Sequence, residues 1–535
     1  MWILAAFVNF WQHATVNLLL LFVALAVTGQ FAYDWLTLPK GAAPKLRPKG
    51  TLPVLYNTLH VALHKHHYGD WVVEQLERIG QPFWVRIVGG PDILILNRPE
   101  QFEDVLKAHF EAFEKGDRMN VALKDLIGDG IFGVDGHKWV HQRKTSSNLF
   151  SLRSLRESMA ESIQKHALVL NEIFQRSATS SFSSSQQRSI DLFKLLNRFT
   201  METFAEIGFG VELGSLDAVE DHPFQAAFDG AQRILMMRFV RPKFIWKALR
   251  YLNVGYEREL TQHIRTIDDM VLGIISQALE NRKTQTFAES ASSTGKKDIV
   301  SLFLDNISVN GVGETSSEFD PVFLRDIVVN FLIAGRDTTA QALSWFFYML
   351  SQNPHVEKKL RDEIAAKLPE LYAGKVSSPS MEETGELVYL EAALRETLRL
   401  HPSVPLNSRQ ANRDVVLSDG TLIKKGNCCS VSSYVLARMT HVWGEDAKEF
   451  VPERWIDSQT DKIIQVSTFK APFFHAGPRM CLGMNLAMME MKIVAAMVLS
   501  KFHLELVPGQ NVTYDLSLTH PIKGELMMNV VPVVA

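Results

Sequence analysis

The feature that most constrains this chain is a single cysteine framed by two glycines, in the run FHAGPRMCLG of residues 474–483. Gly477 and Gly483 permit a tight turn and the close approach of a flat ligand, because glycine has no Cβ. Residues 482–502 contain no proline and are rich in Met, Ala and Leu, so they predict a helix. Cys481 would then lie at the N-terminus of that helix, where the helix dipole and free N–H groups favour a thiolate.

Arg479, two residues before the cysteine, could pair with a carboxylate of a bound ligand. A haem offers an iron for the sulfur and two propionates for cations. The competing interpretation is a buried structural cysteine, the commoner fate of a lone cysteine. The pattern Phe-x-x-Gly-x-Arg-x-Cys-x-Gly, which begins at Phe474, resembles the cysteine loop of the cytochrome P450 superfamily of haem-thiolate monooxygenases. The resemblance implies that Phe474, Gly477 and Arg479 surround haem b and that Cys481 is the axial thiolate ligand of its iron.

Composition favours a globular protein of a reducing compartment that does not bind nucleic acid. The chain has 535 residues, of which 46% are hydrophobic, so a large buried core is possible. The net charge of −3 gives no reason to expect a nucleic acid partner. With only three cysteines, two of them adjacent, the sequence predicts no disulfide framework and favours a reducing compartment.

The N-terminus predicts a membrane anchor. Residues 1–33 contain no Asp, Glu, Lys or Arg and are long enough to span a bilayer, and Lys40, Lys45, Arg47 and Lys49 follow. This distribution of charge places the body of the protein on the cytosolic side. A cleaved signal peptide is the alternative, but the basic n-region is missing and the apolar run is not short. We therefore expect a single-pass anchor over residues 1–35 in the endoplasmic reticulum membrane, a proline-rich hinge over 36–55 and one catalytic domain over 56–535.

The body reads as mainly α-helical with a small β-rich part, and the resemblance implies the cytochrome P450 fold. Residues 83–88 and 92–96 flank Gly-Gly-Pro and predict a hairpin, and short strands are expected near 415–417, 428–431 and the C-terminus. Residues 128–133, GDGIFG, fit the glycine fingerprint of dinucleotide-binding loops. We reject that interpretation because another turn, not a helix, follows at once.

A polar insert, AGRDTT at residues 334–339, interrupts the apolar helical pattern of residues 323–347. Gly335 would let the helix open locally, and nearby side chains could bind the freed carbonyl groups. Asp337 and Thr338 supply an acid and an alcohol suited to relaying protons. The alternative is a helix with a satisfied polar patch. Given Cys481 downstream, we predict that Asp337 and Thr338 are catalytic.

Further motifs agree with the family resemblance in order along the chain. The resemblance implies that Glu396, Arg399 and Arg454 form a buried structural ion network. It also implies that Trp139 and Arg143, four residues apart on one helix face, reach a haem propionate, with Arg409 a weaker candidate and His137 weaker still.

The implied reaction is insertion of one atom of molecular oxygen into a substrate. No flavin or iron–sulfur module is apparent, so the resemblance implies electrons from a membrane-bound, flavin-containing NADPH–cytochrome reductase. Four segments resemble the fatty-acid and alkane ω-hydroxylases of plants, fungi and related eukaryotes: residues 128–132, 142–145, 336–339 and 443–446. A long-chain fatty acid is therefore the expected lipid substrate, and we place the substrate loop at residues 113–132. The alternatives are a sterol or terpenoid hydroxylase, a reductase-independent isomerase or dehydratase, and a non-catalytic haem sensor.

Residues 238–250 contain five basic residues, no acid and interleaved aromatic and aliphatic side chains. Such a stretch could be a helix in the membrane interface, beside the mouth through which a lipid enters and where a cation would suit its carboxylate. The alternative is an ordinary amphipathic helix on the body of the protein.

Overall fold

The computed structural model describes residues 28–29, 45–150, 155–179, 189–218, 223–288, 299–309 and 320–533. The predicted anchor, apart from residues 28–29, and the start of the hinge lie outside the described residues. Within the described ranges, no helix combines the length and the apolar character needed to cross a bilayer.

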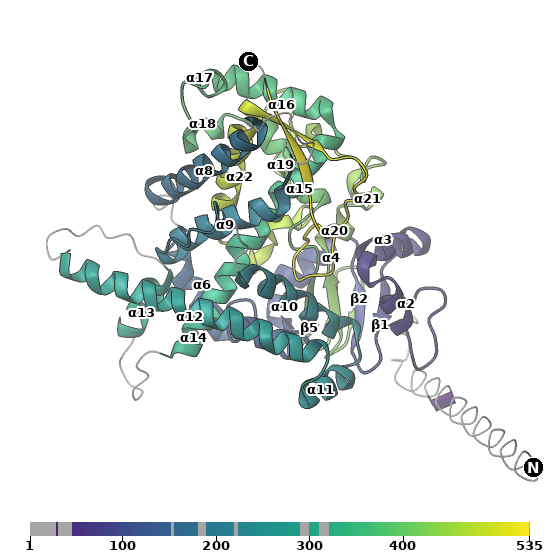
Figure 1. The fold of residues 1–535 in the computed structure, drawn as a ribbon. Helices are drawn as coiled ribbons and strands as arrows, with labels where there is room; N and C mark the ends of the chain where they lie inside the picture. The colour runs from purple at the N-terminus through teal and green to yellow at the C-terminus, as the bar shows by residue number, and fades with distance from the viewer. Residues whose placement is uncertain are drawn as a thin grey trace, which may run out of the picture.

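Helices dominate the body, as the sequence predicts (Figure 1). The α-helices are α2 (Thr58–Leu63), α3 (Tyr68–Ile79), α4 (Pro99–Glu103), α5 (Gly116–Ile127), α6 (Gly136–Ser147), α8 (Ala160–Thr179), α9 (Leu192–Phe209), α10 (Pro223–Val240), α11 (Lys243–Leu252), α12 (Tyr256–Ala288), α13 (Ile299–Val309), α14 (Pro321–Leu332), α15 (Thr338–Gln352), α16 (Pro354–Lys367), α17 (Pro369–Tyr372), α18 (Met381–Gly385), α19 (Val388–Leu400), α20 (Ser433–Leu436), α21 (Thr440–Trp443) and α22 (Met484–Lys501). The short 3₁₀ and π turns are η1 (Lys65–His67), η2 (Asp104–Ala108), η3 (Phe110–Ala112), η4 (Leu155–Met159), η5 (Ile333–Asp337), η6 (Pro452–Trp455), η7 (Pro472–Phe474) and η8 (Gly477–Arg479).

The strands are few and short, and they form three small sheets. They are β1 (Phe83–Arg86), β2 (Asp92–Ile95), β3 (Phe113–Glu114), β4 (Ser189–Asp191), β5 (Asn407–Ala411), β6 (Val415–Val416), β7 (Leu422–Ile423), β8 (Cys428–Val431), β9 (Phe502–Leu506) and β10 (Met527–Pro532). The largest sheet has the order β1-β2-β8-β5-β3, in which β2 and β8 are parallel. The hairpin predicted around Gly-Gly-Pro is β1–β2, with Phe83 opposite Ile95, and the strands expected near 415, 428 and the C-terminus are also present.

The core lies where the longest apolar helices cross. Helix α15 packs against α9, α19 and α22, and its face is closed by large buried side chains such as Trp345 and Phe346. The α22 helix is buried along almost its whole length, which explains why its sequence is apolar all round rather than amphipathic. The residues that carry chemistry therefore lie on elements that are held from several sides.

The described end of the predicted hinge is fixed to the sheet. Lys45 and Arg47 both donate to the carboxylate of Asp92, at 2.5 and 2.6 Å, and the Trp84 N–H donates to the Leu46 carbonyl. Asp92 is buried, and the two cations lower its pKa despite that burial. The hinge thus enters the body as a clamped segment beside β2.

Candidate functional site

The cysteine loop is a tight turn closed by backbone hydrogen bonds. The Cys481 N–H donates to the Phe474 carbonyl at 2.9 Å, and the Met480 N–H donates to the Gly477 carbonyl at 3.0 Å. Gly477 has φ +68°, and a Cβ there would lie 2.2 Å from the Leu106 carbonyl oxygen of η2. Glycine is therefore required at this position by both backbone conformation and packing. The predicted helix after the loop is α22.

The thiol of Cys481 is exposed, although burial raises its pKa. A group can meet both conditions when it lies within the protein but faces open space. A backbone hydrogen bond from Gly483 and the charge of Arg143 act in the opposite direction and favour the thiolate. Cys481 thus keeps an accessible side chain while protein atoms surround it, with a positive charge nearby.

Helix α6 brings two of the predicted residues to this loop. Trp139 is buried, and the Arg143 guanidinium lies 5.8 Å from the centre of its indole ring. The Arg479 guanidinium, from the cysteine loop, lies 4.4 Å from the same ring and donates to Asp135 at 2.5 Å. Trp139 therefore joins the two arginines at one site. His137, by contrast, is exposed on the first turn of α6 and is not part of this arrangement.

Buried cations outnumber carboxylates around the loop. Arg409 on β5 is 2% exposed and donates to His475 at 3.1 Å, and burial and Arg479 lower its pKa to about 9. Lys115 is also buried, and burial, Arg409 and Arg479 hold its pKa well below its usual range. Asp135 is the single carboxylate in the described chain that acts on either cation. Uncompensated buried charge is costly, so this cluster requires an anionic ligand.

A haem fits these residues. A soft and accessible sulfur donor suits iron, and the excess of buried cations near the cysteine loop suits two propionates. Cys481 could therefore hold the metal. Arg143, Lys115, Arg409 and Arg479 could hold the carboxylates, with Trp139 packed between two of the arginines.

The polar insert forms a π turn, η5, between α14 and α15. A π turn is a widened helical turn, so the local opening predicted at Gly335 is present. Thr338 donates its hydroxyl to the Ala334 carbonyl at 2.7 Å, and Thr200 on α9 donates to the Arg336 carbonyl at 2.8 Å. A Cβ on Gly335 would lie 2.1 Å from the Phe204 ring, so this glycine lets α9 approach. Side-chain hydroxyls thus bind carbonyl groups that the widened turn leaves free.

Asp337 is buried and accepts two hydrogen bonds. Gln232 on α10 donates to it at 2.6 Å and Arg336 donates at 2.8 Å. Burial raises the pKa of Asp337 to about 6, against the opposing effect of the Arg336 charge. A carboxyl group with that pKa can gain and lose a proton near neutral pH. Arg336 itself is fully buried and also pairs with Asp229, which gives α10 a second link to the π turn.

The π turn is connected to the cysteine helix through a buried carboxyl. Glu490 on α22 is 5% exposed and is hydrogen-bonded by Thr339, the residue after Thr338. Burial raises the pKa of Glu490 to about 8, and one of its oxygens has no hydrogen-bond partner. Thr338 begins α15 and Cys481 lies in the loop just before α22, and these two helices are in direct contact.

The predicted ion network is present. Arg399 donates to both oxygens of Glu396 at 2.8 Å, and Arg454 donates to one of them at 2.9 Å. The Trp455 indole N–H donates to the other oxygen at 2.9 Å. The remaining N–H groups of Arg399 reach the carbonyls of Ala437, Ala447 and Glu449. Each charge in this network has its partners.

The glycine-rich loop of residues 128–133 has a packing role. A Cβ on Gly128 would lie 1.9 Å from the Asp326 carboxyl, and one on Gly130 would lie 2.1 Å from Asn330, both on α14. Asp326 and Asn330 accept hydrogen bonds from backbone N–H groups of the loop. The glycines thus let the loop lie directly on α14.

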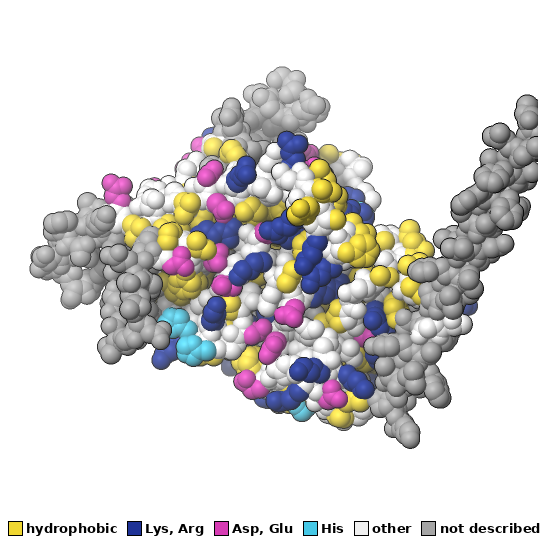
Figure 2. All heavy atoms as spheres, turned by 90° about the horizontal axis from the view of Figure 1, so that it is seen from below, with side chains coloured by type: hydrophobic (Ala, Val, Ile, Leu, Met, Phe, Trp, Pro, Cys, Tyr) yellow, Lys and Arg dark blue, Asp and Glu magenta, His cyan; other side chains and the backbone are white. Residues whose placement is uncertain are grey.

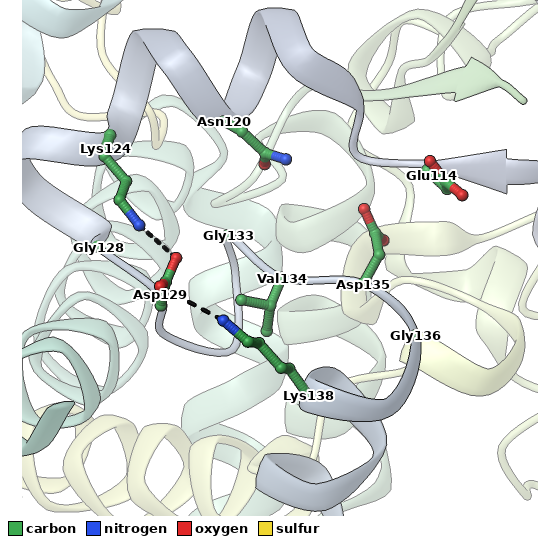
Figure 3. Close-up of a pocket in the computed structure, with 10 residues that line it drawn as sticks. All are labelled: Glu114, Asn120, Lys124, Gly128, Asp129, Gly133, Val134, Asp135, Gly136 and Lys138. Carbon is green, nitrogen blue, oxygen red and sulfur yellow. Dashed lines mark hydrogen bonds and ion pairs between the residues drawn. The ribbon is translucent and has the colours of Figure 1, made fainter.

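The outer side of this loop borders a polar hollow of about 430 Å³ (Figure 3). Lys124 and Lys138 extend into it, and both pair with Asp129. Because its two lysines already share a carboxylate, this hollow has no cation left for a phosphate.

The basic stretch 238–250 is not one helix. Helix α10 ends at Val240, Pro242 precedes α11, and Arg238 belongs to the buried end of α10. Arg238 donates to Glu257 at 2.5 Å and to Asp125 at 2.7 Å, so it faces the protein interior and not a membrane. The hypothesis of a single interfacial helix was wrong in this respect, because carboxylates from α5 and α12 neutralise its first arginine.

Several residues at the site escaped the sequence interpretation. Lys115 stands in no recognisable motif, and its place is set by the pairing of β3 with β5. His475 lies inside the cysteine motif at a position that the pattern leaves open, so adjacency was its only signal. Gln232 and Glu490 read as ordinary helical residues, and only tertiary contact places them beside the π turn.

Comparisons with known proteins agree with this geometry. The family model described as Cytochrome P450 matches residues 46–527. Cytochrome P450 86B1 of Arabidopsis thaliana is 36% identical over 81% of this chain and 76% of its own. Cytochrome P450 704C1 of Pinus taeda is 34% identical over 97% of this chain and 99% of its own, and Cytochrome P450 monooxygenase cyp1 of Mycosarcoma maydis is 32% identical over 90% and 74%.

Proposed function

Because the chain belongs to the cytochrome P450 family and is a haem-thiolate monooxygenase, we propose that it hydroxylates the terminal carbon of a long-chain fatty acid. The balanced reaction is R–H + O2 + 2 electrons + 2 H⁺ giving R–OH + H2O. The observation that carries the monooxygenase chemistry is the exposed Cys481 side chain in a loop beside buried, uncompensated cations. The fatty acid is supported by the resemblance of residues 336–339 and three other segments to ω-hydroxylases.

In this proposal the bound haem activates molecular oxygen for insertion into a C–H bond. Cys481 would bind the iron through its sulfur, and a thiolate ligand would make the iron more electron-rich. Trp139, Arg143, Arg409 and Arg479 hold the propionates, together with Lys115. The packing of Gly477 against Leu106 keeps the loop in the conformation that presents the sulfur.

Asp337 and Thr338 hold and move protons in this scheme. With a pKa of about 6, Asp337 is mostly ionised at pH 7 and can take a proton from solvent and release it. The Thr338 hydroxyl, hydrogen-bonded to Ala334, can pass a proton and stay in place. Gln232 and Arg336 hold the carboxylate in one orientation, so both are positioning residues.

We also propose that a flavin-containing NADPH reductase supplies the electrons and that both proteins act at the endoplasmic reticulum membrane, with residues 1–35 as the anchor. A surface beside the hinge supports contact with lipid. Helix α11 exposes Phe244, Tyr251 and Leu252, and α2 exposes Leu59 and Leu63. Figure 2, which views the molecule from below, shows hydrophobic side chains interspersed with Lys and Arg on the face that includes α11. Such a mixture favours the boundary between lipid tails and headgroups.

The membrane proposal has a direct test. An environment-sensitive probe attached at Phe244→Cys should shift to the emission of an apolar environment when the full chain enters vesicles. The same probe at Val416→Cys, an exposed position on β6, should not shift. Equal emission at the two positions would contradict contact between α11 and lipid.

The function is tested with a difference spectrum of the reduced protein with carbon monoxide and a titration with fatty acids of several lengths. We expect the band of a thiolate-bound haem, a low-to-high-spin shift with long-chain acids, and an ω-hydroxy product with reductase and NADPH. A thiolate band with a shift for sterols alone would replace the substrate class. No thiolate band in folded, haem-loaded protein would remove Cys481 as ligand and, with it, the proposed chemistry.

A further inference from the structure

Arg118, in the first turn of α5, has no carboxylate partner among the residues that the structure describes. One terminal nitrogen, Nη2, donates to the Phe239 carbonyl at 2.6 Å, at the end of α10. The other, Nη1, is buried and has no hydrogen-bond partner in the described chain. A guanidinium donates through five N–H groups, so a buried nitrogen without an acceptor can donate to a ligand.

The charges around Arg118 confirm that it lacks an anion. Burial lowers its pKa, and the two groups that act in the opposite direction are the Cys428 thiol and the Tyr68 phenol. Burial raises the pKa of Cys428 to about 11 and that of Tyr68 to about 12, so both groups are neutral at pH 7. Arg238, near the same end of α10, has two carboxylates by contrast. Arg118 is therefore a partly buried cation beside two neutral groups, with a buried nitrogen that can still donate to a substrate carboxylate.

Several elements converge on this guanidinium. Tyr68 begins α3, Cys428 begins β8, Phe239 closes α10, and Gly90 lies in the turn between β1 and β2. A Cβ on Gly90 would lie 3.3 Å from Nη1, so the missing side chain leaves the free nitrogen approachable. Arg118 also lies within residues 113–132, the segment predicted to cap the substrate.

We propose that Arg118, with the Tyr68 hydroxyl as a second donor, binds the carboxylate of the fatty acid and so selects acids over neutral lipids. This inference rests on the proposed function, since it names how that substrate is recognised. The free Nη1 and the phenolic O–H offer two donors to two carboxylate oxygens, and the arginine supplies the charge. Holding the acid group at this residue leaves the other end of the chain as the part free to reach the haem.

The experiment compares binding of dodecanoic acid and methyl dodecanoate by the low-to-high-spin shift in the full-length, haem-loaded protein. Wild-type protein should bind the acid at least about tenfold more tightly than the ester, because hydrogen bonds to charged groups are the stronger ones. Arg118→Gln keeps a donor for the Phe239 carbonyl but removes the charge. It should weaken acid binding about tenfold to a hundredfold, raise KM more than it lowers kcat, and leave ester binding within about twofold.

Arg241→Gln is the matched control, since it removes a positive charge two residues from Phe239 without touching Arg118. It should keep the preference for the acid. Equal affinity of the wild-type protein for acid and ester, or unchanged acid binding by Arg118→Gln, would overturn the inference. If the wild type still hydroxylates fatty acids in that case, the proposed function stands. Absence of any spin shift or hydroxylation with fatty acids would overturn both. If Arg118→Gln does not fold, the wild-type comparison and Arg118→Lys, which should retain the preference for the acid, decide the question.

Discussion

Two groups of buried charge in this protein contain arginines in similar surroundings, yet they differ in how those charges are satisfied. Around Glu396, both carboxylate oxygens accept from arginines and from an indole, and the remaining N–H groups of Arg399 donate to three carbonyl groups. Around Cys481, Lys115 and Arg409 share a single carboxylate, that of Asp135. A network in which every charge has a counter-ion stabilises the fold. A network with excess positive charge can bind an anionic ligand. The balance of charge, more than the type of residue, separates a structural cluster from a binding site.

The largest effect should come from breaking the complete network. Glu396→Ala leaves the buried Arg399 without its carboxylate and Arg454 with Asp446 alone, and should lower the free energy of unfolding by about 3–5 kcal/mol, with or without haem. Urea unfolding of both forms measures this. Glu453→Gln, which loses only half-exposed partners, is the control and should cost no more than about 1 kcal/mol. An equal loss in the two variants would contradict the comparison.

Glu490 extends the comparison to a buried carboxyl on which no cation of the described residues acts. Its pKa is about 8 in the folded protein and 4.5 when unperturbed, so the folded state binds the proton more tightly. This group therefore favours folding below about pH 4.5, loses that contribution as the pH rises from there to about 8, and adds no slope above. Glu490→Gln should remove this slope and be more stable than wild type at pH 8 by about 4 kcal/mol. Parallel stability curves from pH 5 to 8 would show that Glu490 ionises normally.

Removing a cation from the cluster around Cys481 should affect the haem-free and the haem-bound protein in opposite directions. Arg409→Met should leave the haem-free protein as stable as wild type or more so, because it relieves repulsion with Arg479. It should weaken haem binding about tenfold to a hundredfold, because a propionate loses a charged donor. Transfer of haem to apomyoglobin measures the second effect. Arg399→Met, by contrast, should destabilise both forms, and the same response from Arg409→Met would make Arg409 a structural residue.

The smallest effect should come from the exposed ion pairs at the polar hollow. Asp129→Asn removes the partner of Lys124 and Lys138, but all three side chains are about half exposed or more. We expect a change in the free energy of unfolding of no more than about 1 kcal/mol, decreasing as salt is added. Thermal unfolding at low and high ionic strength checks this, and a larger loss would mean that the loop depends on its charges and not on its glycines.

The role of a residue could be predicted from the sequence where that residue type has few structural roles in its local pattern. Gly477 is needed for a positive φ, Gly335 marks the widened helix, and Glu396 with Arg399 are three residues apart on one helix face. The break at Pro242 was also visible, but the pairing of Arg238 with Asp125 was not, because α5 lies more than a hundred residues away in the chain. The interfacial hypothesis failed at Arg238 for that reason.

By itself the sequence determined the thiol, the turn that presents it, the acid and alcohol of the π turn, and the mainly helical class. Each of these depends on neighbours within a few residues, where spacing and backbone preference act directly. Only the tertiary structure decided which cations have a carboxylate partner. In the sequence, nothing distinguishes Arg238, which has one, from Arg409, Lys115 and Arg118. Whether a buried charge finds its counter-ion depends on what the fold brings within hydrogen-bond distance, and that decides which of these residues remain available to a ligand.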